Sequence, residues 1–235
     1  METGCQNERV TPAGRPRSID TAALTAAVLA QLAEHPAAGE IRVVDVARRL
    51  EVNPATVYRA IDAPDDLTRL ALDDVLRDIH PPELDGDDWR SYLDDLTWQF
   101  WHALRARPGV ASLPPIVPMG HPPLLEIFGA ALATLEHCGF SALDSALAVD
   151  MVIDLAIDST RSREQLAARI HETRRVADDQ WMAAMPRVTR DAFVEAISGD
   201  PSRWFGRKLQ VALDGIGHVL GDGDAGAGRQ KRDAG

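Results

Sequence analysis

The stretch from residue 41 to residue 67, IRVVDVARRLEVNPATVYRAIDAPDDL, predicts two short helices joined by a tight turn and followed by the start of a third. Apolar side chains in its first half recur at three- and four-residue spacing, which is typical of a helix with one buried face. They are Val43, Val46, Ala47 and Leu50. After a break at residues 51–53, Asn53 and Pro54 favour a new helix, because Asn caps free N–H groups and Pro needs none at the first position.

The second of these helices has an outward face suited to reading DNA. The periodicity turns Val57, Ala60 and Ile61 toward the neighbouring helix. Small, hydroxyl and basic side chains then point outward, as a helix that enters the major groove requires. These outward residues are Ala55, Thr56, Tyr58 and Arg59. The alternative is a helix-turn-helix that serves only for packing.

The composition predicts a folded protein without a membrane segment. The chain has 235 residues and 45% of them are hydrophobic, which is enough for one large domain or two modest ones. No apolar run approaches the ~18 residues that span a bilayer, and no signal peptide opens the chain, so a cytoplasmic location is expected. Cys5 and Cys138 lie far apart without metal-ligand spacing, so neither a disulfide scaffold nor a zinc site is expected.

The charge distribution requires any DNA contact to depend on local arginines. The formal net charge is −11, which disfavours unspecific coating of nucleic acid. Residues 1–61 carry seven basic and seven acidic side chains, and residues 62–80 carry two basic and six acidic. The field of the whole N-terminal region therefore does not attract phosphate.

The hydrophobic periodicity predicts an all-α fold with two domains. Helices are expected over 18–80 as a four-helix unit and over 84–220 as a larger one, with a boundary at Pro81-Pro82 and Asp85-Gly86. No strand alternation or repeat is present. In the larger unit the expected helices cover 89–105, 124–137, 143–159, 163–185, 192–197 and 200–220.

Both ends of the chain are predicted to be disordered. Residues 1–17 lack periodicity, and residues 221–235 are rich in Gly, Asp and basic side chains. Arg15 and Arg17 in the first segment fit a basic arm that enters a minor groove, and a solubilising tail is the other interpretation.

The chain resembles the TetR family of transcriptional repressors over about residues 18–220. The helix-turn-helix segment is the most specific part, and three C-terminal segments follow in the order expected of the family's ligand-binding domain. The segments are VVDVARRLEVNPATVYRAI at 43–61, PDDL at 64–67, RPGV at 107–110, LLEIFGAALATLEHCGF at 124–140 and WFGRKLQVALDGI at 204–216.

The resemblance implies that Thr56, Tyr58 and Arg59 face DNA, and that Arg42 with Arg48 or Arg49 clamps the backbone. The full set of expected DNA-binding residues is Arg15, Arg17, Arg42, Asn53, Ala55, Thr56, Tyr58 and Arg59.

Three positions depart from the family pattern. Glu51 stands where the turn commonly has Gly, and Ala60 stands where His is common. The basic residue usual before the fourth helix is missing, and Asp62, Asp65 and Asp66 surround the site instead. These departures predict modest DNA affinity or a narrow operator preference, because each lost phosphate contact weakens binding.

The resemblance further implies a small-molecule pocket and a homodimer formed through the last long helices, 143–159 and 201–220, with part of 163–180 as a further candidate. Dimers of this kind read palindromic sites about one DNA turn, ~34 Å, apart. The pocket candidates are apolar and aromatic residues with a few polar groups, a composition that suits drug-sized ligands. They are Trp98, Trp101, His102, Met119, His121, Phe128, Met151 and Asp154. The competing interpretation places these side chains in an ordinary core.

A row of acidic residues has several interpretations. Asp150, Asp154 and Asp158 recur every four residues on an otherwise apolar helix. The row can meet a cationic ligand or a metal, pair with Arg203 or Arg207 across a dimer, or face solvent. His102 and His121 are isolated and fit core or loop positions better than metal ligands.

The sequence therefore predicts a ligand-responsive, DNA-binding regulator, a repressor released from a palindromic operator by a small molecule. No catalytic motif, cofactor site or metal site is expected. The alternative is a ligand-binding or protein-interaction module whose helix-turn-helix binds DNA only weakly.

Overall fold

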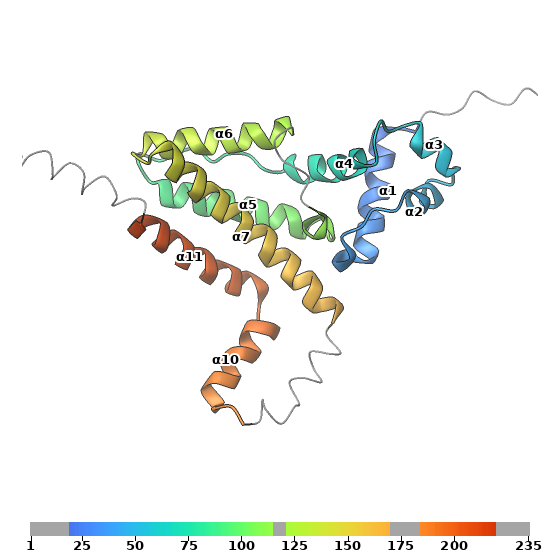
Figure 1. The fold of residues 1–235 in the computed structure, drawn as a ribbon. Helices are drawn as coiled ribbons and strands as arrows, with labels where there is room; N and C mark the ends of the chain where they lie inside the picture. The colour runs from blue at the N-terminus through green and yellow to red at the C-terminus, as the bar shows by residue number, and fades with distance from the viewer. Residues whose placement is uncertain (1–18, 115–120, 170–183, 220–235) are drawn as a thin grey trace, which may run out of the picture.

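The computed structural model describes residues 19–114, 121–169 and 184–219 (Figure 1). Within these ranges the chain forms helices and turns without any strand, so the predicted all-α fold is confirmed. None of the described helices combines the length and the apolar content needed to span a bilayer. The predicted arm at 1–17 and tail at 221–235 lie outside the described residues.

Four helices form the N-terminal unit, at one end of the molecule in Figure 1. They are α1 (Thr21–Glu34), α2 (Val43–Arg49), α3 (Pro54–Tyr58) and α4 (Asp65–Leu76), with a short 3-10 helix, η1 (Pro36–Ala38), after α1. Their apolar faces meet in a shared core of fully buried side chains: Val28, Val46, Ala47, Val57, Leu67, Ala71 and Val75. The stripe at three- and four-residue spacing is therefore what packs these short helices together.

Local signals placed the starts of these helices well, but one side chain was placed wrongly. The Asn53 side chain accepts a hydrogen bond from the Ala55 N–H at 2.9 Å, as expected of a cap. Asp20 occupies the cap of α1 but makes no side-chain bond there. Ala60 was expected to be inward and is exposed, because α3 already ends at Tyr58 and helical periodicity no longer applies.

The remaining helices build a second core around α5 (Trp89–Arg105). The others are η2 (Val110–Ser112), α6 (Pro122–His137), α7 (Ala142–Ala168), α10 (Arg187–Ser198) and α11 (Pro201–Val219). α5 packs on α4, α7 and α11, and α6 packs on α7 (Figure 1). Leu93, Leu96, Leu135, Val152 and Leu209 are fully buried there. None of the side chains of α10 is buried within the described chain, and this helix lies below the core in the view of Figure 1.

The prediction that the helix from residue 143 ends at Ser159 was wrong, since α7 continues to Ala168. Its second half is polar, which suggested a separate helix over 163–185. The polar side chains there have tertiary partners instead: Arg161 donates to the Ala111 carbonyl at 2.8 Å, and Arg163 donates to the carbonyls of Ile197 and Gly199. Residues 170–183 lie outside the description.

Several contacts join the N-terminal unit to the second core, and two glycines form one of them. Gly39, which follows η1, lies against the Ser112 carbonyl of η2, and Gly109 lies against the Leu32 carbonyl of α1. Both glycines have positive φ angles, +62° and +92°, a conformation that side chains other than Gly adopt rarely. Gly39 and Gly109, with the carbonyl groups that they contact, form the glycine junction.

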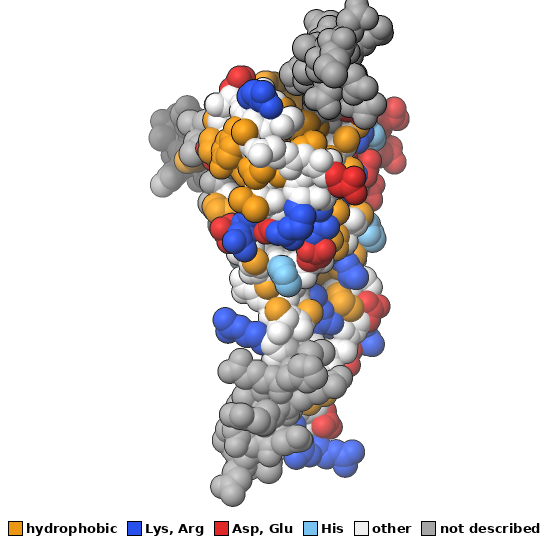
Figure 2. Space-filling view, turned by 90° about the vertical axis from the view of Figure 1, so that its right-hand side faces the viewer, with side chains coloured by type: hydrophobic (Ala, Val, Ile, Leu, Met, Phe, Trp, Pro, Cys, Tyr) orange, Lys and Arg blue, Asp and Glu red, His pale blue; other side chains and the backbone are white. Residues whose placement is uncertain are grey.

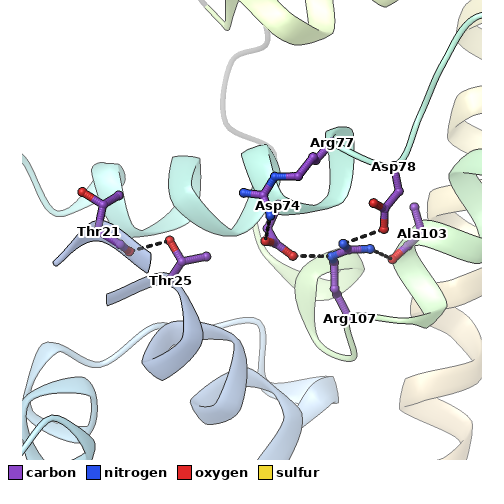
Figure 3. Close-up of polar contacts among 7 residues, drawn as sticks. All are labelled: Thr21, Thr25, Asp74, Arg77, Asp78, Ala103 and Arg107. Atoms are coloured by element: carbon purple, nitrogen blue, oxygen red, sulfur yellow. Dashed lines mark hydrogen bonds and ion pairs between the residues drawn. The ribbon is translucent and has the colours of Figure 1, made fainter. Parts of the chain in front are cut away.

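An ion-pair network forms another of these connections. Arg107 contacts Asp74 at 2.6 Å and Asp78 at 2.7 Å, and also donates to the Ala103 carbonyl (Figure 3). Arg77 shares Asp74 from the solvent side at 2.7 Å. The α4 helix, which follows the predicted DNA-reading helix, is thereby fixed to the end of α5.

Candidate functional site

The α3 helix presents an exposed face at the end of the molecule. Ala55, Tyr58 and Arg59 are exposed, with 56% of Tyr58 accessible, and Thr56 is half-buried. Val57, on the opposite side, is fully buried. The helix is therefore anchored by one side chain and leaves a small, a hydroxyl, an aromatic and a basic side chain on its outer face.

Arg59 folds back over its own helix. Its Nε donates to the Ala55 carbonyl and its terminal nitrogen donates to the Thr56 hydroxyl, both at 3.2 Å. Both contacts are exposed, so the guanidinium can exchange them for a phosphate or a base edge at small cost. Asn53, in contrast, uses its side-chain oxygen to cap α3.

The other arginines near α3 are paired with carboxylates on their own unit. Asp45 contacts both Arg42 and Arg48, which are 64% and 70% exposed, and Arg49 contacts Glu34. Figure 2, which views this end of the molecule, shows basic and acidic side chains interspersed without one continuous basic surface. Arg15 and Arg17 lie outside the described residues.

Asp66 was expected to suit the positive end of the α4 dipole, and it also closes the turn before that helix. Its carboxylate accepts the N–H groups of Asp62 and Ala63, each at 2.8 Å, and it also contacts Arg69. The backbone hydrogen bonds from Ala63 and Asp62 lower the pKa of Asp66. An N-terminal carboxylate that closes the turn between α3 and α4 fixes the angle at which α3 is presented.

Glu51 adopts the left-handed conformation expected of the turn position, with φ of 55°. Among the described residues it is the one non-Gly residue with positive φ. The Val52 N–H bonds to the Ala47 carbonyl at 3.0 Å, the pattern that commonly closes a helix with Gly at this place. The turn between α2 and α3 is therefore formed despite backbone strain.

We expect Glu51→Gly to stabilise the protein. Relief of left-handed strain contributes roughly 1–2 kcal/mol, and the greater flexibility of Gly in the unfolded chain removes about 0.5–1 kcal/mol. A net gain raises the melting temperature by roughly 1–4 °C for a chain of this size. Thermal unfolding monitored by circular dichroism measures it. Glu51→Ala removes the charge but keeps the Cβ, so an equal rise in that variant would contradict strain as the cause.

Three of the predicted ligand-binding residues lie together on α5. The Trp98 and Trp101 rings are 5.1 Å apart edge to face, and the His102 ring lies 5.5 Å from Trp98. Phe205 of α11 stacks on Trp101 at 5.0 Å. Trp98 and His102 border an open surface hollow, and Trp101, which is only 4% exposed, borders a partly open cavity between α5, α7 and α11.

The other predicted ligand-binding residues lie elsewhere. His121 is buried before α6, with its Nε2 2.8 Å from Asp73 and its Nδ1 without a partner in the described chain. Phe128 is half-buried on α6, and Met151 and Asp154 are exposed on α7; none of the three borders the cavities described here. Met119 lies outside the described residues.

The acidic row on α7 makes no contact with Arg203 or Arg207 within the described part of one chain. Asp158 pairs with Arg161 at 3.0 Å. Burial, followed by the charges of Asp150 and Asp158, raises the pKa of Asp154. In the described ranges no group of three or more metal-ligating side chains comes together.

A cavity of about 220 Å³ lies between α5, α7 and α11. Aromatic rings and cationic groups from all three helices line it: Trp101, Arg105, Arg163, Trp204, Phe205 and Lys208. The sequence alone does not group these residues, because Trp101 and Lys208 lie 107 residues apart and no spacing pattern links the three helices. The cavity differs from the predicted pocket in all residues except Trp101.

Apolar side chains also remain exposed along α7 and α11. Leu143 is 78% exposed, Leu147 46% and Met151 41%, at four-residue spacing on α7, and Val211 on α11 is 67% exposed. A shallow groove between the two helices is lined by Leu155, Trp204, Arg207, Lys208, Val211 and Ala212. An exposed apolar stripe of this kind marks an interaction surface.

Comparisons with known proteins find similarity in structure. No protein-family model matches the sequence, and no curated protein sequence matches it. ActR from Streptomyces coelicolor, solved in complex with actinorhodin, aligns with a TM-score of 0.66 at 19% identity over 87% of this chain and 98% of its own. A variant of TetR from Acinetobacter baumannii AYE, in complex with minocycline, aligns with a TM-score of 0.62 at 17% identity over 86% of this chain and 98% of its own.

Mycobacterium smegmatis BioQ is also similar, with a TM-score of 0.56 at 22% identity over 84% of this chain and 97% of its own. The similarity covers both the helix-turn-helix unit and the larger helical core, over nearly the full length of each of these proteins. The chain therefore has the all-α fold of the TetR-type transcriptional regulators.

Proposed function

We propose that the protein is a ligand-responsive transcriptional regulator that binds a palindromic operator as a homodimer and is released by a small molecule. The observation that carries this proposal is the exposed outer face of α3, with Tyr58 and Arg59, on a unit anchored to a TetR-type core. In this proposal 18–80 is the DNA-binding domain and 84–220 the ligand-binding and dimerisation domain.

DNA contact then proceeds by exchange of ion pairs. Arg42 and Arg48 share Asp45 on the surface, and exposed pairs of this kind are worth only about 0–1 kcal/mol. Either arginine can leave Asp45 for a phosphate, while Tyr58 donates to a second phosphate and Arg59 with Thr56 reaches base edges. Few base contacts are available, which favours a narrow operator preference.

Dimerisation is assigned to the exposed apolar stripe of α7 and α11. Leu143, Leu147 and Val211 are more exposed than side chains of their size are in a finished core. A two-fold axis through this stripe makes the interface self-complementary and relates two α3 helices, as a palindromic site requires. Arg207, which borders the groove, can then approach the acidic row of the second copy.

Coupling between ligand and DNA is assigned to the glycine junction and the Arg107 network. Both connect the N-terminal unit to the end of α5, close to the cavity between α5, α7 and α11. A ligand that shifts η2 changes the position of both α3 helices. Since such coupling is reciprocal, operator DNA weakens ligand binding by the factor by which ligand weakens operator binding.

A second candidate function is a ligand-binding or protein-interaction module with weak DNA affinity. It is favoured by the pairing of Arg42 and Arg48 with Asp45 and of Arg69 with Asp66, which leaves the described residues at this end of the molecule without a continuous basic surface.

A gel shift with the gene's own upstream region distinguishes the two. At ~50 mM salt, where phosphate contacts are strongest, we expect a specific shift that Arg59→Ala weakens by roughly 10- to 100-fold, as expected for a lost base contact worth 1–3 kcal/mol. Arg90→Ala is the matched control, because Arg90 is a half-exposed arginine on α5, paired with Asp214, and its loss changes the net charge equally.

Equal weakening by Arg59→Ala and Arg90→Ala would mean that charge alone governs binding and would contradict readout by α3. No shift by the unaltered protein at ~50 mM salt would support the interaction module instead.

A further inference from the structure

We propose that the cavity between α5, α7 and α11 is the effector site and that it selects a small planar aromatic acid of one or two rings. The proposal rests on the proposed function in one respect, namely that the bound molecule acts as an effector of DNA binding. Binding of the molecule to the cavity does not itself depend on DNA. Three features carry it: the surplus of cations, the stacked rings and an unpartnered buried hydroxyl.

Cations dominate the lining of the cavity. Arg105, Arg163 and Lys208 border it, against one carboxylate, Glu164. In the described chain no carboxylate lies within ion-pair distance of Arg105 or Lys208. Hydrogen bonds from Ser202 chiefly lower the pKa of Asp200, and the charges of Arg105 and Arg163 lower it further. Asp200 does not line the cavity. The site therefore has positive charge that a ligand anion can neutralise.

Glu164 does not pair with these cations, because its carboxylate is engaged in hydrogen bonds with η2. It accepts the Gly109 N–H and the Ser112 hydroxyl, each at 2.8 Å. Burial raises the pKa of Glu164 against these hydrogen bonds, so its charged form is disfavoured there. Arg163 also donates to the carbonyls of Ile197 and Gly199, so Arg105 and Lys208 are the lining cations without a carboxylate or carbonyl partner among the described residues.

Aromatic side chains give the cavity a planar, apolar wall. Trp101 stacks on Phe205 with an angle of 8° between the rings, and the Arg105 guanidinium lies 4.5 Å over Trp101. Trp204, which is 39% exposed, also lines the cavity. The volume of about 220 Å³ is below the roughly 300–1,000 Å³ of pockets for drug-sized ligands, so one or two rings fit best.

The Ser159 hydroxyl supplies an independent indication of a ligand. Its oxygen is buried and has no hydrogen-bond partner in the described chain, and Ser159 lines the cavity. Buried hydroxyls are normally paired, so an orphaned one needs a partner that is not part of the chain. A ligand carboxylate can accept a hydrogen bond from this hydroxyl and at the same time pair with Lys208 or Arg105.

The site is also connected to the DNA-binding unit through Glu164. That residue borders the cavity and holds η2 by Gly109 and Ser112, and these two residues form the glycine junction with Leu32 and Gly39. An anion placed beside Glu164 disfavours its charged form further and weakens its hold on η2. The Glu164 carboxylate therefore both borders the proposed anion site and holds the segment that contacts the DNA-binding unit.

Isothermal titration of the full-length protein without DNA tests the proposal, with 1-naphthoate and its uncharged isostere 1-naphthamide as probes. We expect the acid to bind at least tenfold more tightly than the amide. Lys208→Met should remove most of that preference and leave amide binding unchanged. Arg187→Met is the control for loss of one positive charge, because Arg187 is 86% exposed on α10 and lines neither the cavity nor the groove, and it should change neither affinity by more than twofold.

Ser159→Ala separates a ligand-binding role from a structural one. It should weaken acid binding about fivefold, as loss of one hydrogen bond does, while the melting temperature stays the same or rises because an unpaired buried hydroxyl is removed. A fall in melting temperature without loss of acid binding would overturn the role of Ser159.

Equal affinities for acid and amide, equal effects of Lys208→Met and Arg187→Met, or no binding at millimolar acid would overturn the proposal. Failure of operator binding together with selective acid binding would instead refute the proposed function and leave the site assignment standing. A specific operator shift without selective acid binding would refute only the site.

Discussion

Gly39→Ala is expected to destabilise the protein by roughly 3 kcal/mol, which combines overpacking with left-handed strain. A Cβ built at Gly39 would lie far inside 3.0 Å of the Ser112 carbonyl oxygen, a separation that real Cβ atoms do not show. Both partners are backbone, so neither can rotate away as a side chain would. The melting temperature should fall by roughly 6–12 °C, as measured by circular dichroism.

Gly86→Ala is the matched control for this effect. Gly86 has nearly the same φ angle, 59° against 62°, but no atom lies within 4 Å of a Cβ built there. Its substitution therefore costs only the strain of roughly 1–2 kcal/mol. Equal losses at Gly39 and Gly86 would show that the junction is not a tight contact and would contradict its place in the coupling path.

The functional consequence of Gly39→Ala follows from where the contact lies. The shared core of the N-terminal unit does not include Gly39, so α3 should keep its own packing. The variant is therefore expected to retain operator binding at temperatures below its melting transition while responding less to a ligand.

Local patterns in the sequence predicted the N-terminal unit well. The Asn53 cap, the strained Glu51 turn and the inward Val57 were all expected, and the structure confirms each of them. These features depend on residues within four or five positions of each other, where helix periodicity and capping chemistry dominate. Prediction failed at Ala60 because it extended that periodicity beyond the end of α3.

Features that depend on distant segments could not be predicted. The extension of α7 to Ala168 rests on Arg161 and Arg163 finding carbonyl partners 34 to 50 residues away. The cavity draws its cations from three separate helices, and no spacing rule links Arg105 to Lys208. The pairing of both Arg42 and Arg48 with Asp45 likewise decides which basic side chains are available, although their charges were visible in the sequence.

Arg107→Met is expected to lower the free energy of unfolding at pH 7 by roughly 2–3 kcal/mol. This loss is small for a broken buried ion pair, because Asp78, one of the two partners of Arg107, is half-exposed. Arg107 and Asp74 are 13% and 16% exposed, so the Asp74 carboxylate keeps its burial and loses its main partner (Figure 3). Arg77→Met is the matched control. Arg77 contacts the same carboxylate but is 68% exposed, so its loss should cost less than about 1 kcal/mol.

The pH dependence of this loss identifies its cause. Burial by itself raises the pKa of Asp74, but the hydrogen bond and charge of Arg107, with a contribution from Arg77, outweigh it and leave the pKa lowered. A carboxylate with a lowered folded-state pKa stabilises the protein above its unfolded pKa of about 3.9 and loses that contribution as the pH falls through the folded value. Urea unfolding should therefore show the full difference between Arg107→Met and the unaltered protein at pH 7, and a smaller one below about pH 4. A difference that persists unchanged at pH 3 would mean that Arg107 holds α4 by packing of its aliphatic stem, and the ion pair would then not be the link between α4 and the end of α5.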